Sequence, residues 1–199
     1  MSNIKGYDKV AKFFDLFRAG DMRRWTPTQQ ALFKQMAGRV IYVGVGTGLE
    51  IVNFPTGFHI TAVDLSSKML ENARKRAENY TGKIDLCLMD AERLAFPDNS
   101  FDTAVAVCVF CTVKNPIRGL KELKRVLKPE SKLLMFEHVL SKNPVYALSL
   151  KLMSHFTEAL EGTYLTRHTV ENVKKSGFQI DSVQNVYLDI VKTITAGPA

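Results

Sequence analysis

Short, continuous runs of apolar residues alternate along the chain with segments in which apolar residues recur at helical spacing. Unbroken apolar runs are typical of parallel strands that helices cover on both faces. The five runs lie at residues 39–44, 58–63, 83–88, 101–110 and 131–138, and the predicted helices between them at 48–53, 67–79 and 115–127. This order of elements predicts an α/β fold.

The two ends of the chain extend the pattern. Helices are predicted at residues 8–18 and 27–36 before the first strand, and at 144–160 and 167–176 after the fifth. Two strands of alternating polarity are predicted last, at 178–187 and 190–196. Ser66 or Ser67 is a suitable N-cap for the helix over 67–79. We therefore expect a single domain over residues 1–199 with a seven-stranded sheet.

The first apolar run leads into a glycine-rich loop, Gly44-Val45-Gly46-Thr47-Gly48, and the second run is followed by Asp64. Glycine lets a backbone turn sharply and approach a ligand closely, because it has no Cβ. An acid at the end of the second strand of a parallel sheet can accept hydrogen bonds from both hydroxyls of a ribose. The two features together predict a nucleoside-cofactor site. The glycines alone would also fit a tight strand-to-helix turn in any α/β protein.

The glycine spacing restricts the type of cofactor. A dinucleotide fingerprint, G-x-G-x-x-G, requires glycine where this chain has Leu49. No Gly-Lys-Ser/Thr follows the loop, which argues against a phosphate-binding P-loop. The spacing G-x-G-x-G is therefore neither of these two motifs.

Three later segments complete a family pattern. They are Asp90-Ala91, Phe96-Pro97-Asp98 with Phe101-Asp102, and the helix end over 122–129 before the strand over 132–136. With the glycine loop and Val63-Asp64-Leu65-Ser66, they resemble the class I S-adenosylmethionine-dependent methyltransferases over residues 38–139, specifically the family of the ubiquinone/menaquinone C-methyltransferases. The resemblance implies a three-layer Rossmann-like sandwich, whose mostly parallel sheet has an antiparallel last strand, and S-adenosyl-L-methionine as cofactor.

The resemblance also implies roles for single residues. Asp64 would bind the ribose hydroxyls, and Leu65 would flank the adenine. Asp90 would accept a hydrogen bond from the adenine amino group, near the backbone amide of Ala91. The remaining cofactor positions would be Gly44, Val45, Gly46 and Gly48 beneath the methionine part, and Val109 and Cys111 beside the sulfonium.

Tyr42 is a departure from the family pattern. The family usually carries Glu or Asp at this position, where the acid helps to hold the methionyl end of the cofactor. Tyrosine can donate or accept a hydrogen bond but carries no charge near neutral pH. Tyr42 therefore puts the affinity for the cofactor in question more than its identity.

Composition agrees with one globular domain, because 46% of the 199 residues are hydrophobic and 24% are charged. The chain has three cysteines, Cys87, Cys108 and Cys111, an odd number within predicted strands or their ends, so we expect a reduced cytoplasmic protein. No signal peptide or membrane-spanning run is apparent. In an extended strand Cys108 and Cys111 would point to opposite faces, so we expect no metal site.

The positive charge is concentrated near the N-terminus. Residues 1–39 contain eight Lys and Arg and three Asp, so they supply +5 of the net charge of +7. Aromatic residues accompany this charge, and two compatible interpretations of the segment 1–37 follow: a contact with an anionic membrane at the inner surface, or a lid over the cofactor. We expect no nucleic-acid partner, since the fourth strand lacks an Asn/Asp-Pro-Pro-aromatic clamp.

The segment 143–165 is inserted where this fold normally builds its acceptor pocket. Apolar residues recur there at near-helical spacing, namely Val145, Leu148, Leu152, Met153, Phe156 and Leu160. Such a stripe suits either a core helix or the binding of an apolar acceptor. We expect Tyr7, Phe17 and Phe156 to wall an apolar pocket for a hydrophobic small molecule or a phospholipid.

Motifs in the C-terminal third of the chain narrow the choice of substrate class. Phe136-Glu137-His138-Val139, Glu161-Gly162-Thr163-Tyr164-Leu165-Thr166-Arg167 and Ser176-Gly177-Phe178 resemble both bacterial phosphatidylethanolamine N-methyltransferases and membrane-associated thiol methyltransferases of animals. We expect amine methylation of a phosphatidylethanolamine-type headgroup. Carbon methylation of a quinone precursor, sulfur methylation of a thiol, and cofactor binding without turnover are the alternatives.

Two residues are candidates for the catalytic step. His138 is the first candidate for a general base, because an imidazole titrates near neutral pH. A structural histidine at the end of a strand is an equally good interpretation of the same residue. Tyr7 is expected to close over the cofactor.

Overall fold

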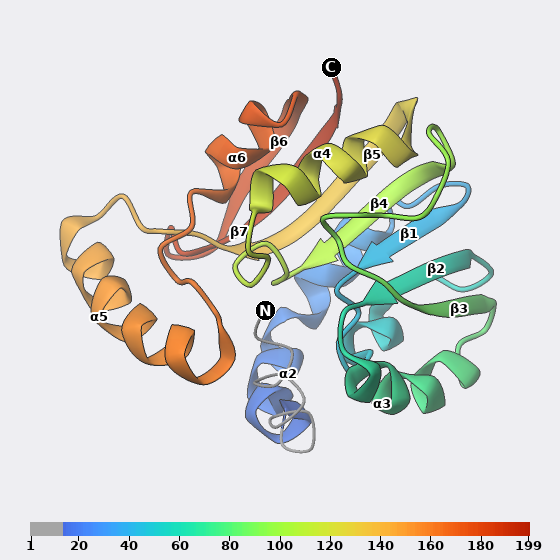
Figure 1. Cartoon of the computed structure of the whole chain (residues 1–199). Coiled ribbons are helices and arrows are strands. Elements are labelled where there is room, and N and C mark those ends of the chain that lie inside the picture. The colour runs from blue at the N-terminus through green and yellow to red at the C-terminus, as the bar shows by residue number, and fades with distance from the viewer. Residues whose placement is uncertain (1–13) are drawn as a thin grey trace.

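The computed structural model describes residues 14–199, and its centre is a seven-stranded sheet with the order β3-β2-β1-β4-β5-β7-β6 (Figure 1). The strands are β1 (Val40–Val43), β2 (His59–Asp64), β3 (Lys83–Leu88), β4 (Phe101–Val107), β5 (Leu127–His138), β6 (Phe178–Tyr187) and β7 (Val191–Pro198). Strands β1 to β5 are parallel, whereas β7 is antiparallel to both of its neighbours. The predicted α/β fold is confirmed, including the antiparallel last strand.

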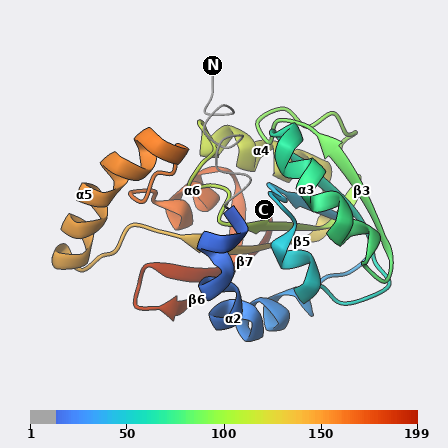
Figure 2. The same cartoon turned by 90° about the horizontal axis from the view of Figure 1, so that it is seen from below.

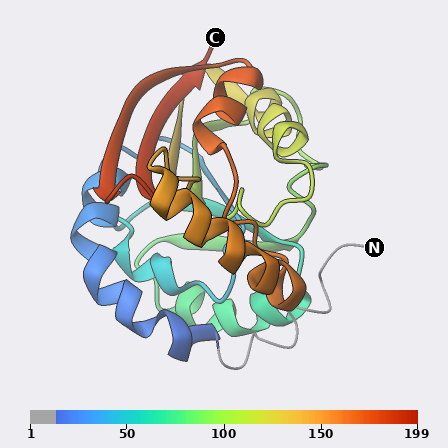
Figure 3. The ribbon, with the colours of Figure 1, turned by 90° about the vertical axis from the view of Figure 1, so that its left-hand side faces the viewer.

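Helices cover both faces of this sheet. They are α2 (Phe14–Phe33), the 3₁₀ helix η1 (Leu49–Asn53), α3 (Ser67–Glu78), α4 (Pro116–Val126), α5 (Pro144–Glu161) and α6 (Thr169–Lys175). Figure 3 shows α2 on one side of the sheet and α4 and α6 on the other, and Figure 2 shows α2 and α3 from below. Helix α5 stands to one side of these three layers (Figure 1). None of the helices within residues 14–199 is both long and apolar enough to cross a bilayer.

Burial on both faces explains why the strands are unbroken apolar runs. All four residues of β1 are at most 1% exposed, so both faces of its pleat are covered. On one face of the sheet, Leu133 packs with Leu120 and Leu123 of α4 and with Val173 of α6. The cluster on the other face includes Phe33, Tyr42, Phe54, Ile60, Ala73 and Phe136.

Local signals fix several helix ends, and the cap of α3 is the one expected from the sequence. The Ser66 side chain accepts a hydrogen bond from the Met69 N–H at 3.2 Å, so Ser66 is the N-cap of α3. Asn115 and Asn143 cap α4 and α5, and a proline follows each of them at the first helical position. These caps orient the helices that cover the sheet and flank its edge.

The N-terminal region differs from the prediction of two helices at 8–18 and 27–36. Within the described residues one helix, α2, continues through Gly20 and Pro27, two residues that disfavour a helix interior. Trp25 lies between them and is buried against aromatic rings of β5 and β6. Tertiary packing therefore overrides local propensity here. Residues 1–13, which contain half of the first predicted helix, lie outside the described part.

The fourth strand is shorter than its apolar run. β4 ends at Val107, because Cys108 has a left-handed φ of 53° that a strand does not accommodate. Cys108 and Cys111 lie in a turn, where the Cys111 Sγ is 3.2 Å from the Cys108 carbonyl oxygen. The expectation that these cysteines point to opposite faces of an extended strand is wrong.

Candidate functional site

The glycine loop lies at the carboxyl end of β1, and two of its glycines are required by its geometry. A Cβ on Gly44 would lie 2.3 Å from the Val109 Cγ2, so only glycine lets the loop pack against the turn after β4. Gly46 has a φ of 56°, and a Cβ there would meet no atom within 4 Å. The loop is therefore closely packed on one side and open at Gly46 on the other.

The Asp64 side chain connects this loop to the end of β2 by hydrogen bonds. Its Oδ2 accepts a hydrogen bond from the Gly46 N–H at 2.8 Å, and its Oδ1 accepts one from the Ser66 N–H at 2.9 Å. Burial raises the pKa of Asp64 above its ordinary value near 3.8, and hydrogen bonds from backbone N–H groups only partly offset this rise. Leu65, the next residue, is 38% exposed. Asp64 thus presents a partly desolvated carboxylate beside the open part of the loop.

Asp90 lies two residues beyond the end of the neighbouring strand, β3. The Met89 N–H donates to the Asp64 carbonyl oxygen at 2.9 Å, which holds the two strand ends together. The Asp90 Oδ1 accepts from the Glu92 N–H at 2.8 Å, so the carboxylate closes a tight turn over Ala91. The structure therefore brings Asp64, Asp90 and Ala91 to one edge of the sheet, as the sequence predicts.

A buried acid organises the turn after β4. The Glu137 Oε1 accepts hydrogen bonds from the Val109 N–H at 2.9 Å and from the Phe110 N–H at 3.1 Å, and Glu137 is fully buried. These bonds hold the turn whose Val109 side chain lies against Gly44 of the glycine loop. Glu137 was not predicted as a functional residue, although an acid inside an apolar strand is itself a signal, because a buried carboxylate needs hydrogen-bond donors.

Tyr42 has an acidic partner that was not predicted from the sequence. Its ring is fully buried, and its hydroxyl donates to the Glu50 Oε2 at 3.2 Å. Glu50 is only 7% exposed and lies in the first turn of η1, which begins after the last glycine of the loop. The spacing of eight residues across a loop gives no periodic signal that could have revealed this pair.

Helix α2 is joined to the glycine loop by a small polar network. The Thr47 hydroxyl donates to the Asp15 Oδ1 at 2.6 Å, and the Arg76 guanidinium donates to the Asp15 Oδ2 at 2.7 Å. Arg76 also donates to the Thr47 carbonyl oxygen at 2.8 Å. The start of α2 is therefore held against the loop and against the end of α3.

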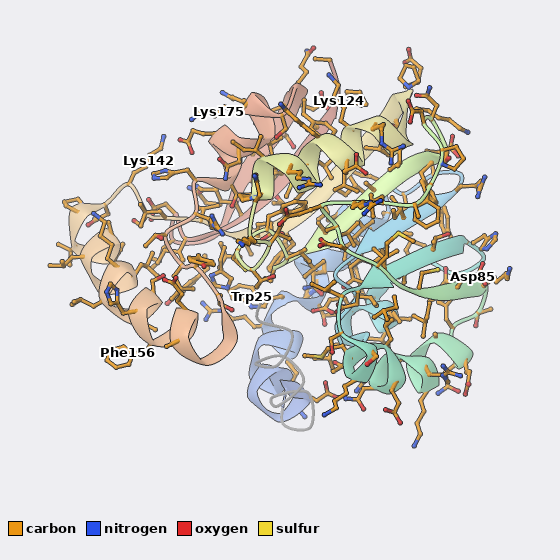
Figure 4. The ribbon with its side chains drawn as sticks, viewed as in Figure 1. Trp25, Asp85, Lys124, Lys142, Phe156 and Lys175 are labelled. Atoms are coloured by element: carbon orange, nitrogen blue, oxygen red, sulfur yellow. The ribbon has the colours of Figure 1, made fainter. Side chains whose placement is uncertain are left out.

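Of the two candidate catalytic residues, only His138 lies within the described part of the structure. His138 is the last residue of β5 and is partly buried, one residue beyond Glu137. Tyr7 lies outside the described residues, as does the side chain of Phe17. Phe156 is 73% exposed and points away from the rest of the molecule (Figure 4), so the expectation that it walls the pocket is wrong. Within residues 14–199 no cluster of side chains is arranged to hold a metal ion.

A family model for a methyltransferase domain matches residues 41–135, which contain the loop, Asp64 and Asp90. The chain is 35% identical over 126 residues to a phosphatidylethanolamine N-methyltransferase of Cereibacter sphaeroides, and the match covers 62% of each protein. Residues 41–135 therefore resemble a methyltransferase domain, and the chain is similar to S-adenosylmethionine-dependent methyltransferases.

Other methyltransferases are comparably similar. Identity is 35% to the ubiquinone/menaquinone biosynthesis C-methyltransferase UbiE of Geotalea daltonii, with 50% of this chain and 45% of that protein covered. The chain is 31% identical to the thiol S-methyltransferase TMT1B of Rattus norvegicus, with 70% of this chain and 59% of that protein covered. The chain thus spans between 45% and 62% of the length of these three curated relatives.

A solved structure confirms the fold of the chain. An S-adenosylmethionine-dependent methyltransferase from Thermotoga maritima superposes with a TM-score of 0.73, at 20% identity, over 98% of this chain and 99% of that one. At this identity the likeness concerns the fold alone.

The residues present fit S-adenosylmethionine, the cofactor of this family. The open side of Gly46 leaves room for a ligand above the loop, where any other residue would place a Cβ. Two carboxylates, Asp64 and Asp90, lie at adjacent strand ends and can accept hydrogen bonds from hydroxyl and amino groups. These two acceptors match a nucleoside whose link to a methionyl group carries no negative charge, rather than a phosphate.

The role of Glu137 can be tested by stability. Glu137→Ala leaves two backbone N–H groups buried without an acceptor, so it should lower the free energy of unfolding by about 2–5 kcal/mol. Glu137→Gln keeps one acceptor oxygen and should cost less than half as much. Urea unfolding followed by circular dichroism measures both changes. Equal stability of the alanine variant and the wild type would show that the turn does not depend on Glu137.

Proposed function

We propose that this protein transfers the methyl group of S-adenosylmethionine to a hydrophobic small molecule or lipid headgroup, with a phosphatidylethanolamine-type amine as the preferred acceptor. The observation that carries the proposal is the glycine loop, which is open at Gly46 and fastened by Asp64. The similarity to a relative named as a phosphatidylethanolamine N-methyltransferase supports the choice of acceptor.

In this proposal the nucleoside end of the cofactor lies against β2 and β3. Asp64 accepts hydrogen bonds from the two ribose hydroxyls, and the exposed Leu65 side chain packs against the adenine. Asp90 accepts from the adenine amino group, with the Ala91 amide beside it. The hydrogen bonds that already hold both carboxylates fix their positions before the ligand arrives, which reduces the entropy cost of binding.

The methionyl end of the cofactor lies above the loop of Gly44, Val45, Gly46 and Gly48. We assign its positively charged ammonium group to the pair of Tyr42 and Glu50. Glu50 supplies a buried carboxylate directly after the loop, and the Tyr42 hydroxyl orients it by a hydrogen bond. The pair would provide the negative charge that Tyr42 alone lacks.

Methyl transfer is an in-line displacement at carbon, and the bound cofactor supplies a sulfonium leaving group. The acceptor nitrogen must approach opposite the sulfur, near Val109 and Cys111, whose positions are fixed by the turn after β4. These residues, together with the rest of the site, would align the acceptor and exclude water. A protonated amine must first lose a proton, and His138 would accept it at the end of β5.

The flanking segments would select the acceptor. We assign residues 1–37 to a lid and membrane contact, and the network of Asp15, Thr47 and Arg76 supports a lid position for α2.

Residues 143–165 would form one side of the acceptor site, because the Tyr164 N–H donates to the Cys111 carbonyl oxygen at 2.8 Å. Tyr7 would close over the cofactor. A nucleic acid is not among the acceptors we propose.

Carbon and sulfur are two other candidate acceptor atoms, and only similarity to relatives supports them. Relatives named as a quinone-pathway C-methyltransferase and as a thiol S-methyltransferase match the chain at 35% and 31% identity. Incubation with methyl-labelled S-adenosylmethionine and a total lipid extract would separate the three by the mass of the labelled product. Cofactor binding without any labelled product would favour a protein that binds the cofactor without turnover.

Replacing Asp64 should weaken binding of the cofactor. Asp64→Asn should reduce the affinity for S-adenosylhomocysteine, the demethylated cofactor, by about 1.5–3 kcal/mol in calorimetry, because one charged acceptor is lost. Asp85→Asn is the matched control, since Asp85 pairs with His59 and Lys83 at the outer edge of the sheet (Figure 4). Equal affinity of the Asp64 variant and the wild type would remove Asp64 from the site.

The same ligand provides a pH test. The pKa of Asp64 is raised by burial, so its carboxylate becomes protonated at a higher pH than an ordinary aspartate. Protonation removes the acceptor, and wild-type affinity should therefore fall on acidification before the pH reaches about 4, the ordinary range for Asp. The Asp64→Asn variant should bind weakly with no such fall.

The Glu50 assignment predicts an effect confined to one end of the cofactor. Glu50→Gln should weaken binding of S-adenosylhomocysteine about tenfold, because the ammonium group loses its anionic partner and keeps only a neutral acceptor. Binding of 5′-methylthioadenosine, which lacks the amino-acid end, should not change. Tyr42→Phe should show the same selectivity with a smaller effect. Equal losses for both ligands would mean that Glu50 stabilises the loop and does not contact the ammonium group.

His138 can be tested once the acceptor is known. If it is the base for a protonated amine, His138→Ala should lower the rate of methyl transfer about 10²–10⁴-fold and leave cofactor affinity unchanged. His59→Ala is the control, because His59 lies at the opposite end of β2 from Asp64 and contacts Asp85. Full turnover by the His138 variant would leave alignment and desolvation as the mechanism.

A further inference from the structure

Helix α5 carries its apolar side chains on its outer face. Large apolar residues there are more than half exposed, namely Val145 at 71%, Leu148 at 60%, Leu152 at 65%, Met153 at 55% and Phe156 at 73%. Spacings of three and four residues place Val145, Leu148, Leu152 and Phe156 in one stripe along the helix, with Met153 beside it. Figure 4 shows Phe156 pointing away from the three layers. We call these five residues the α5 stripe.

The inner face of α5 is mostly polar. Leu150 and Ser154 are buried, and the Ser154 hydroxyl accepts a hydrogen bond from the Leu165 N–H at 3.2 Å. The Thr157 hydroxyl donates to the Thr163 carbonyl oxygen at 2.8 Å. A helix that packs on a core shows the reverse arrangement, with its apolar side inward. The sequence of α5 therefore suits an apolar medium on its outer side.

This surface stands out from the rest of the molecule. Among the described residues, seven large apolar side chains are more than half exposed, and five of them form the α5 stripe. The other two, Val52 and Leu88, lie on separate elements. A contiguous apolar patch of this kind marks a contact with a membrane or a partner.

The charges beside the stripe indicate which of these it is. Lys142 precedes the helix and Lys151 lies within it, and the span of the stripe contains no acid; the two acids of α5, Glu158 and Glu161, follow Phe156 near the end of the helix. Figure 4 shows Lys142 at the outer end of α5. Lysines flanking an apolar helix face are typical of helices that lie in the interface of an anionic bilayer.

We propose that α5 docks on an anionic lipid bilayer, with the α5 stripe in the headgroup region and Lys142 and Lys151 against lipid phosphates. The docking does not depend on which acceptor is methylated. It would place the edge of the proposed acceptor site next to the membrane, because the Tyr164 N–H after α5 bonds to the Cys111 carbonyl oxygen at 2.8 Å. A lipid-borne acceptor could then enter without crossing water.

The test measures partition of the full chain onto vesicles of phosphatidylglycerol and phosphatidylcholine, with no cofactor or acceptor present. Failure of the proposed methyl transfer therefore leaves this result unaffected. The double variant Leu152→Ser/Phe156→Ser removes two side chains of the stripe and should lower the partition coefficient about 10–100-fold. The matched control Val52→Ser/Leu88→Ser removes two equally exposed apolar side chains elsewhere and should bind as the wild type does. Thermal unfolding checks that both variants remain folded.

A charge variant tests the second part of the proposal. Lys151→Glu should lower partition about fivefold or more, and the difference from the wild type should shrink at high salt, because screening weakens the attraction to anionic lipid. Vesicles of phosphatidylcholine alone should bind the wild type more weakly than the mixed vesicles.

Three results would overturn the proposal. The first is a wild type that does not bind the anionic vesicles. The second is equal binding by the wild type and the stripe variant, which would transfer membrane contact to the N-terminal segment 1–37. The third is a wild-type dimer that the stripe variant converts to monomer in sedimentation experiments, since a second copy would then be the occupant of the stripe.

Discussion

Two chain segments meet at Gly44 with no room for a side chain between them, and the candidate site depends on this contact. A Cβ at this position would overlap the Val109 side chain, which belongs to the turn after β4. Glu137 of β5 holds the same turn through two backbone N–H groups. Asp64 of β2 then ties the loop to its other neighbour. The ends of β1, β2, β4 and β5 are thereby held in one arrangement, which is the preorganisation that ligand binding and alignment require.

The sequence predicts most of this frame because its signals are local. Continuous apolar runs locate the strands to within about three residues at most ends, and the glycine spacing with Asp64 and Asp90 locates the edge that carries the site. The Ser66 cap is likewise visible in the sequence. These features persist in the structure because a parallel sheet buried on both faces leaves little freedom in which residues form its strands.

The parts that the sequence does not predict depend on contacts between distant segments. The bond from Val109 to Glu137 joins residues 28 positions apart, and the bond from Thr47 to Asp15 joins residues 32 apart. The apolar residues of α5 recur with the period of a core helix. The period alone does not show whether the apolar side of the helix faces the rest of the molecule or the solvent. Phe156 was expected in a pocket for this reason, and its outward position follows from the polar anchoring of the opposite face.

The single tryptophan of the chain lies where the N-terminal helix meets the sheet. Trp25 is 8% exposed, its ring centroid is 5.9 Å from that of Phe136 and 6.0 Å from that of Tyr187, and the Arg24 guanidinium lies 4.4 Å from it. Any opening of α2 would move this indole from an aromatic, desolvated environment into water. Its intrinsic fluorescence is therefore an unmodified optical probe of whether α2 is seated, and it can be followed in real time while ligands or vesicles are added.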